Sequence, residues 1–141
     1  MPVEQNKKII RRFFEEGMNQ RNFSLMNEYI AGNYVNHDMP GSEPGPSGFR
    51  KVIENFLNGF PDMHIRLDEV IGDGNIVATR GEWSGTHSGD FMGMPGTGKK
   101  VRVKFIDMWK LENEKAVENW VQMDIPGLMQ QLGMMPAEAT A

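Results

Sequence analysis

The sequence predicts an α+β domain in which helices cover one face of a curved, mainly antiparallel sheet. Apolar residues recur at helical spacing through roughly the first 60 residues, and the spacing then shortens to the two-residue period of strands. Helices followed by a run of strands are the order typical of α+β domains. The 141 residues, 39% of them hydrophobic, suffice for one core. We therefore expect a single domain over residues 1–133 and a frayed tail at 134–141.

The expected helices are marked by amphipathic stripes and by residues that start or stop a helix. They span residues 3–19, 23–30, 47–60 and 126–132. Asn22 and Ser47 stand where a side chain can cap the free backbone amides of the second and third helices. Pro61 stops the third helix and Gly133 ends the last one. The first three helices supply one layer of the domain.

The expected strands are rich in β-branched and aromatic residues and are separated by turn-forming residues. They span residues 34–37, 65–71, 76–87, 101–111 and 116–124. The turns at 72–75 and 112–115 predict two hairpins in one antiparallel sheet. If Asn113 and Glu114 are the central residues of the second turn, Glu112 pairs with Lys115 and the pairing continues one-for-one along both strands.

Composition and charge argue against several classes of function. Fifteen Lys and Arg against nineteen Asp and Glu give a net charge of −4, without the basic surface that nucleic-acid binding needs. No stretch approaches the roughly 18 apolar residues of a membrane span, so we expect a soluble, cytoplasmic protein. The absence of Cys excludes disulfides and thiolate nucleophiles. The three His are too far apart in sequence to predict a metal site.

The second predicted hairpin brings carboxylates and aromatic rings to one face of the sheet. One-for-one pairing places four residues of the first strand opposite four of the second: Val103, Phe105, Asp107 and Trp109 opposite Asp124, Gln122, Trp120 and Glu118. A carboxylate among aromatic rings loses hydration, which raises its pKa and makes it a general acid or base. Simpler interpretations stay open. Asp124 caps the last helix, Asp107 pairs with a Lys or Arg at the sheet edge, and the tryptophans belong to the core.

The opposite face of this hairpin also carries large apolar residues: Ile106, Met108, Val117, Val121 and Met123. A strand pair that is apolar on both sides is expected to be covered on both sides. Helices would cover one face and a partner subunit the other, so we expect a homodimer. The glycine- and proline-rich loops at 38–48 and 88–99 would edge the mouth of a concavity on the helix-covered face.

Two stretches of sequence carry a family resemblance that spans nearly the whole chain. Residues 85–99 and residues 118–133, the latter ending in Gln130-Gln131-Leu132-Gly133, resemble the SnoaL-like polyketide cyclase (ester cyclase) family, as does the pair Asn36-His37. The resemblance implies an NTF2-like (cystatin-like) cone that encloses a pocket. It also implies an intramolecular aldol ring closure with no metal or cofactor, in which Asp124 is the acid/base. Asn36, or His37 if the alignment shifts by one, would hold the substrate oxygens.

The resulting hypothesis is a cofactor-independent enzyme in which Asp124 moves a proton on a small hydrophobic carbonyl compound. The substrate-binding residues would be Asn36, His37, Gln122, Asp107, Phe105, Trp109, Trp120 and Met18. A histidine that the family carries on its penultimate strand has no counterpart between residues 105 and 110. The alternative is a non-catalytic small-molecule-binding protein on the same scaffold, or an isomerase or hydrolase.

Overall fold

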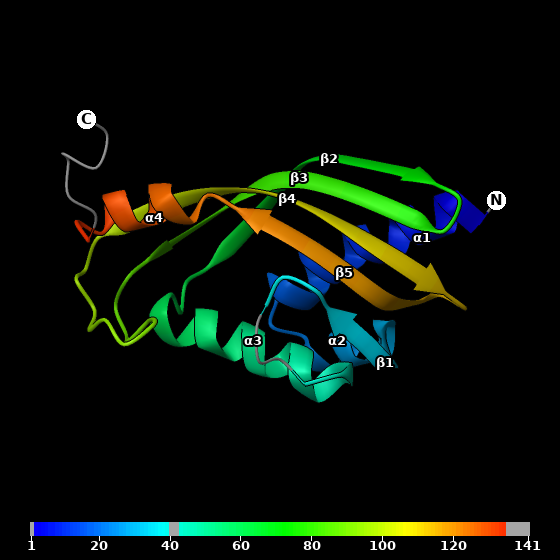
Figure 1. Cartoon of the computed structure of the whole chain (residues 1–141), viewed down its shortest axis with the longest axis horizontal. Helices are drawn as coiled ribbons and strands as arrows, with labels where there is room; N and C mark the ends of the chain where they lie inside the picture. The colour runs from blue at the N-terminus through cyan, green and yellow to red at the C-terminus, as the bar shows by residue number, and fades with distance from the viewer. Residues whose placement is uncertain (1, 40–42, 135–141) are drawn as a thin grey trace.

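The computed structural model describes residues 2–39 and 43–134 of the chain. The elements follow the predicted order of helices and then strands, with one further helix at the end (Figure 1). The helices are α1 (Pro2–Arg12), the π-helix η1 (Phe13–Met18), α2 (Phe23–Tyr29), α3 (Gly45–Gly59) and α4 (Ile125–Gln131). The strands are β1 (Ile30–Asn36), β2 (His64–Asp73), β3 (Ile76–Thr86), β4 (Lys100–Glu112) and β5 (Lys115–Met123).

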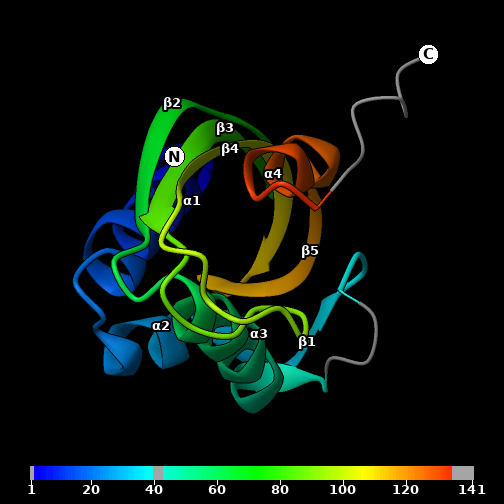
Figure 2. The same ribbon diagram turned by 90° about the vertical axis from the view of Figure 1, so that its left-hand side faces the viewer.

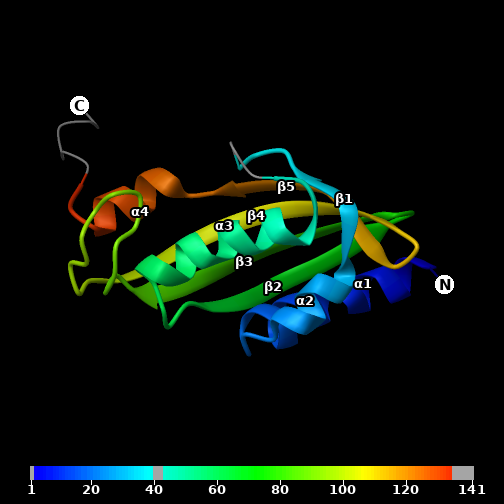
Figure 3. The same ribbon diagram turned by 90° about the horizontal axis from the view of Figure 1, so that it is seen from below.

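The five strands form one sheet in the order β1-β5-β4-β3-β2. Its four long strands are joined antiparallel, whereas β1 runs parallel to β5, so the sheet is mixed. The sheet curves strongly when viewed end-on (Figure 2), but β1 and β2 remain its two free edges and it does not close. Helices α1 and α3 lie along its concave side (Figure 3). The predicted α+β architecture is confirmed.

The first predicted helix is not one regular α-helix but two consecutive helical segments. It begins as α1 and continues into the π-helix, where the Asn19 N–H donates to Phe14 O at 3.0 Å. Gly17 lets this segment approach α2, since a Cβ there would lie 2.8 Å from Met26 Cγ. π-Helical turns are frequent at functional sites. This one directs Phe14 and Met18 toward the space under the sheet.

The two predicted helix caps have different outcomes. Asn22 does cap α2, because its Oδ1 accepts the Leu25 N–H at 3.1 Å. The prediction for Ser47 is wrong, since α3 begins two residues earlier and Pro44 occupies the N-cap without a side-chain hydrogen bond. Proline is tolerated in the first turn of a helix, so Pro46 lies inside α3 rather than before it.

The pairing of β4 with β5 differs from the predicted one-for-one register. Glu112 does pair with Lys115, and Asn113 and Glu114 both adopt the positive φ of a tight two-residue turn. A bulge at Val117 then shifts the register, so that Lys110 pairs with Glu118. One extra residue moves every later side chain to the opposite face. The concave face therefore receives Asn119, Val121 and Met123, and the outer face receives Glu118, Trp120 and Gln122.

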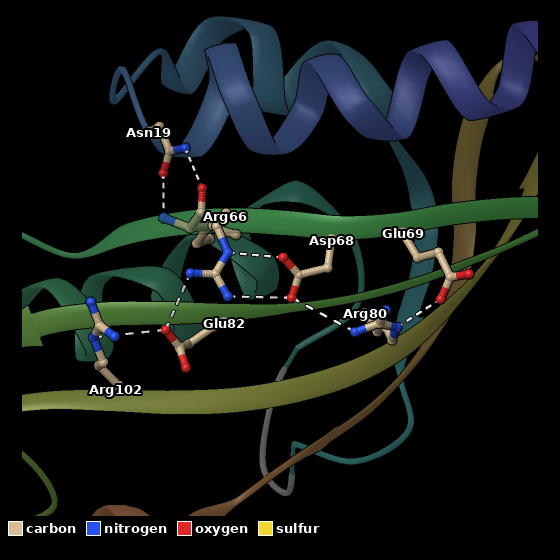
Figure 4. Close-up of polar contacts among 8 residues, drawn as sticks. Asn19, Arg66, Asp68, Glu69, Arg80, Glu82 and Arg102 are labelled. Carbon is tan, nitrogen blue, oxygen red and sulfur yellow. Dashed lines mark hydrogen bonds and ion pairs between the residues drawn. The ribbon is translucent and has the colours of Figure 1, made fainter.

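The outer face of β2, β3 and β4 carries a network of ion pairs around a second bulge (Figure 4). Arg66 contacts both Asp68 and Glu82, while Arg80 contacts Glu69 at 2.6 Å. Gly81 is required beside this bulge because a Cβ there would lie 2.1 Å from the Arg66 carbonyl oxygen. The network fixes the side chains of three strands on a surface that faces away from the helices.

Within the described residues, no helix is both long and apolar enough to cross a membrane.

The homodimer expected from the sequence stays a prediction, and the outer face supplies its test. Ile106 and Met108 of β4 are 60% and 43% exposed there, beside the half-buried Trp120. We expect Met108→Lys to convert a dimer into a monomer, because it places a charge in the apolar part of the interface. Light scattering after gel filtration measures the mass. Met92→Lys, at a residue 69% exposed in the loop between β3 and β4, is the control and should stay dimeric. A wild-type monomer would contradict the prediction.

Candidate active site

A cavity opens between the concave face of the sheet and helices η1 and α3. The empty space between its walls, open mouth included, is about 550 Å³. Its walls are mostly aromatic rings and aliphatic or methionine side chains. The lining residues that the site depends on are Phe14, Met18, Asn36, Trp83, Phe105, Asp107, Trp109 and Asn119.

Among the described residues that line this cavity, Asp107 is the ionisable one. It lies on β4 with 5% of its surface exposed. Its Oδ1 accepts hydrogen bonds from the Thr79 hydroxyl of β3 and from the Trp109 indole N–H, the latter at 3.0 Å. Burial raises the pKa of Asp107 to about 7, although these two hydrogen bonds to the carboxylate act in the opposite direction. At neutral pH the protonated and the ionised forms of Asp107 are therefore both well populated.

The two oxygens of Asp107 have different surroundings. Both hydrogen bonds go to Oδ1, and none of the described residues donates a hydrogen bond to Oδ2. Trp109 is held from three sides, by the edge-on rings of Phe13 and Phe14 at 5.2 and 5.8 Å and by the stacked ring of Tyr34 at 6.5 Å. The carboxyl group is thus fixed through Oδ1, while Oδ2 has no hydrogen-bond donor among the described residues.

A pair of buried amides from β1 and β5 forms the polar part of the neighbouring wall. Asn119 donates from Nδ2 to Met108 O at 2.9 Å, which leaves its Oδ1 as an acceptor for Tyr34 and Asn36. Asn36 accepts the Asp38 N–H on its Oδ1 at 3.0 Å, so its Nδ2 faces the other way as a donor. The bond from Asn36 Nδ2 to Asn119 is long, at 3.4 Å. Asn36 is therefore an oriented N–H donor in the cavity wall.

The structure brings together five of the residues that the sequence predicted for the site: Met18, Asn36, Phe105, Asp107 and Trp109 all line the cavity. Three others lie on the outer side of the sheet. His37 bonds Glu118 at 3.0 Å and stacks on Trp120 at 5.0 Å, while Gln122 is exposed beside Ile106. The predicted place of Trp120 and Gln122 on the catalytic face is wrong because the bulge at Val117 reverses the sides of β5. His37, which directly follows β1, does not line the cavity either.

Asp124 is also outside the cavity. It is exposed and stands at the N-cap of α4, where its Oδ1 accepts the Gly127 N–H at 2.9 Å. Gly127 is needed for this close approach, since a Cβ there would collide with the Asp124 carboxyl group. The expected position of Asp124 among aromatic rings is therefore wrong, and the helix-capping interpretation describes its contacts.

We expect Asp124→Ala to lower the free energy of unfolding by about 1 kcal/mol, the usual cost of losing an N-cap. Binding of a small apolar ligand in the cavity should be unaffected because the side chain does not reach the cavity. Urea unfolding measures the first effect, and the affinity of the variant for a hydrophobic ketone such as 2-acetylnaphthalene measures the second. If binding were lost while stability was retained, the assignment of Asp124 as a cap alone would be contradicted.

Sequence reasoning missed Thr79, Trp83 and Asn119. Thr79 was detectable, because it alternates with Val77 on the inward side of β3 and is therefore a polar residue at a core position. Asn119 was not detectable, because the face of the sheet on which it lies depends on the bulge at Val117. Among residues 2–39 and 43–134, no group of three or more His, Asp or Glu is arranged to hold a metal ion.

The model of the SnoaL-like polyketide cyclase family matches residues 8–132. The chain belongs to this family. Its NTF2-like fold is that of IdmH from Streptomyces antibioticus, a candidate polyketide cyclase, at 29% identity and a TM-score of 0.79, covering 92% of this chain and 99% of IdmH.

Two other solved structures share the fold at lower identity. TsrD from Streptomyces laurentii is 24% identical with a TM-score of 0.85, over 94% of this chain and 97% of its own. AclR from Streptomyces galilaeus, a candidate hydroxylase, is 23% identical with a TM-score of 0.83, over 95% and 99%. No curated protein matches the chain. The candidate activities named for these neighbours differ, so the reaction has to be argued from the cavity.

Proposed function

We propose that this SnoaL-like protein catalyses cofactor-independent proton transfer at the carbon next to a ketone in a hydrophobic substrate, with Asp107 as the acid/base. The observation that carries the proposal is the buried carboxyl group with one oxygen held by Thr79 and Trp109 and the other without a hydrogen-bond donor among the described residues. A general base works best when its pKa is close to the operating pH, and that of Asp107 is raised to about 7.

The chemistry follows from the groups in the wall. Asp107 Oδ2 removes a proton from the carbon next to the carbonyl, and the electron pair moves to the carbonyl oxygen to form an enolate. Asn36 Nδ2 donates a hydrogen bond to that oxygen, where negative charge develops. In an aldol ring closure, the enolate carbon bonds to a second carbonyl carbon of the same molecule. The new alkoxide then takes the proton back from Asp107.

Two further findings support this assignment. The mostly apolar walls lower the local polarity, which strengthens the electrostatic contacts at the cavity surface. The family and the likeness to IdmH favour a polyketide-type substrate, that is, a chain or ring system with several ketones. In this proposal Asp107 performs the role that the sequence assigned to Asp124.

The proposal is tested by hydrogen exchange, which does not require the natural substrate. We expect the protein to accelerate the exchange of the methyl protons of 2-acetylnaphthalene for deuterium in D₂O, as measured by mass spectrometry. Enolisation is the first half of the reaction, so exchange reports on the base directly. If the compound bound without any faster exchange, the alternative of a non-catalytic binding protein would be favoured.

A further inference from the structure

Trp83 carries a buried polar atom that the proposed reaction does not use. It lies on β3 with 3% of its surface exposed, and its indole Nε1 has no hydrogen-bond partner within the described part of the chain. A buried N–H without an acceptor destabilises the folded protein, so each instance requires an explanation. Because Trp83 also lines the cavity, an acceptor on a ligand is one explanation.

The position of Trp83 separates it from the Asp107 end of the cavity. Trp83 and Thr79 lie on the inward side of the same strand, four residues apart, which corresponds to about 13 Å along a strand. Thr79 marks the Asp107 end through its hydrogen bond. The edge-on rings of Phe56 and Phe60, at 5.8 and 5.0 Å, hold the indole of Trp83 in place. Trp83 and the Asp107 end therefore lie at different parts of the cavity wall.

The other buried side-chain atom without a partner in the described chain is Nε2 of His87. His87 does not line this cavity, and its Nδ1 contacts Thr97 at 3.0 Å in the loop after β3. Trp83 is thus distinguished by combining an unpaired donor with a place in the cavity wall.

We infer that the indole N–H of Trp83 binds an oxygen acceptor at the end of the substrate remote from the reacting ketone. The substrate is then an elongated hydrophobic molecule, about the length of two or three fused rings, with a carbonyl or hydroxyl oxygen at each end. This inference rests on the proposed function, because it takes the Asp107 end as the reacting end. Trp83 acts here as a specificity-determining residue and does not touch the reacting atoms.

The three tryptophans of the chain provide the test. After ¹⁵N labelling, the indole N–H signals report on Trp83 in the cavity, Trp109 on Asp107 and Trp120 on the outer face. The probes are 2,6-diacetylnaphthalene and 2-acetyl-6-isopropenylnaphthalene, which have nearly the same shape but differ in the second oxygen. We expect only the diacetyl compound to move the Trp83 proton signal downfield. We also expect it to bind about 3- to 10-fold more tightly, as one added hydrogen bond predicts.

Trp83→Phe removes the N–H and should reduce this preference to about 1, whereas Trp120→Phe is the matched control and should leave it unchanged. An unmoved Trp83 signal, or a preference that survives in Trp83→Phe, would overturn the inference. The wild-type signal decides the matter even if Trp83→Phe fails to fold. Methyl exchange with no shift of Trp83 would overturn this inference and leave the proposed function standing. A Trp83 shift without exchange would support oxygen binding at Trp83 and contradict the proposed function, so the two failures are distinguishable.

Discussion

Asp107→Asn should slow deuterium exchange into 2-acetylnaphthalene by about 100- to 10,000-fold, the range that a general base contributes. The amide has nearly the shape of the carboxyl group, and its oxygen still accepts from Thr79 and Trp109. It has no basic oxygen to remove a proton. Exchange is measured at several pH values, and the affinity for the compound is measured in parallel. Binding should be retained, which separates loss of chemistry from loss of the cavity.

Thr79→Val provides the matched control for this experiment. It removes one of the two hydrogen bonds that lower the pKa of Asp107, so that pKa should rise further while the base remains. The pH at which exchange reaches half its maximum should therefore move upward, and Thr79→Ser should restore it. If Asp107→Asn exchanged protons at the wild-type rate, the base would lie elsewhere and the proposed mechanism would be wrong.

Much of the fold was predictable because it depends on local patterns. The helical stripe of the first helix, the two-residue turn at Asn113 and Glu114, and the alternation along β4 each follow from neighbouring residues. That alternation correctly placed Phe105, Asp107 and Trp109 on one face. The parallel pairing of β1 with β5 was not predictable in this way, because it joins segments more than 80 residues apart.

The candidate site was predicted less well, because a site depends on register. The bulge at Val117 is a single residue, and the sequence around it gives no turn signal. It moves Trp120 and Gln122 outward and brings Asn119 inward, which alters the part of the predicted site that β5 supplies. The choice between Asp107 and Asp124 turned on the same point. The sequence placed both carboxylates beside aromatic rings. The observed register shows that only Asp107 is buried among them, whereas Asp124 caps α4.

The raised pKa of Asp107 should also make the stability of the protein depend on pH. The ordinary pKa of the group is 3.8, which applies to the unfolded chain, and in the folded protein it is raised to about 7. Well below pH 3.8 both states hold the proton, and the group contributes no difference. As the pH rises toward 7, the unfolded chain releases the proton while the folded protein retains it. Stability therefore falls across this window and levels off above it.

Asp107→Asn removes this titration, so it should stabilise the protein increasingly as the pH rises. Each pKa unit is worth about 1.4 kcal/mol, and about two units separate pH 5 from a pKa of about 7. The gain in unfolding free energy over the wild type should thus be about 3 kcal/mol larger at pH 8 than at pH 5, as measured by urea unfolding. The other titrating groups are common to both proteins and cancel in the difference. Parallel curves for the two proteins would mean that Asp107 titrates as an ordinary exposed carboxylate. Active sites are often selected for chemistry at the cost of stability, so the proposed catalytic residue is expected to destabilise the fold, and its replacement is expected to strengthen it.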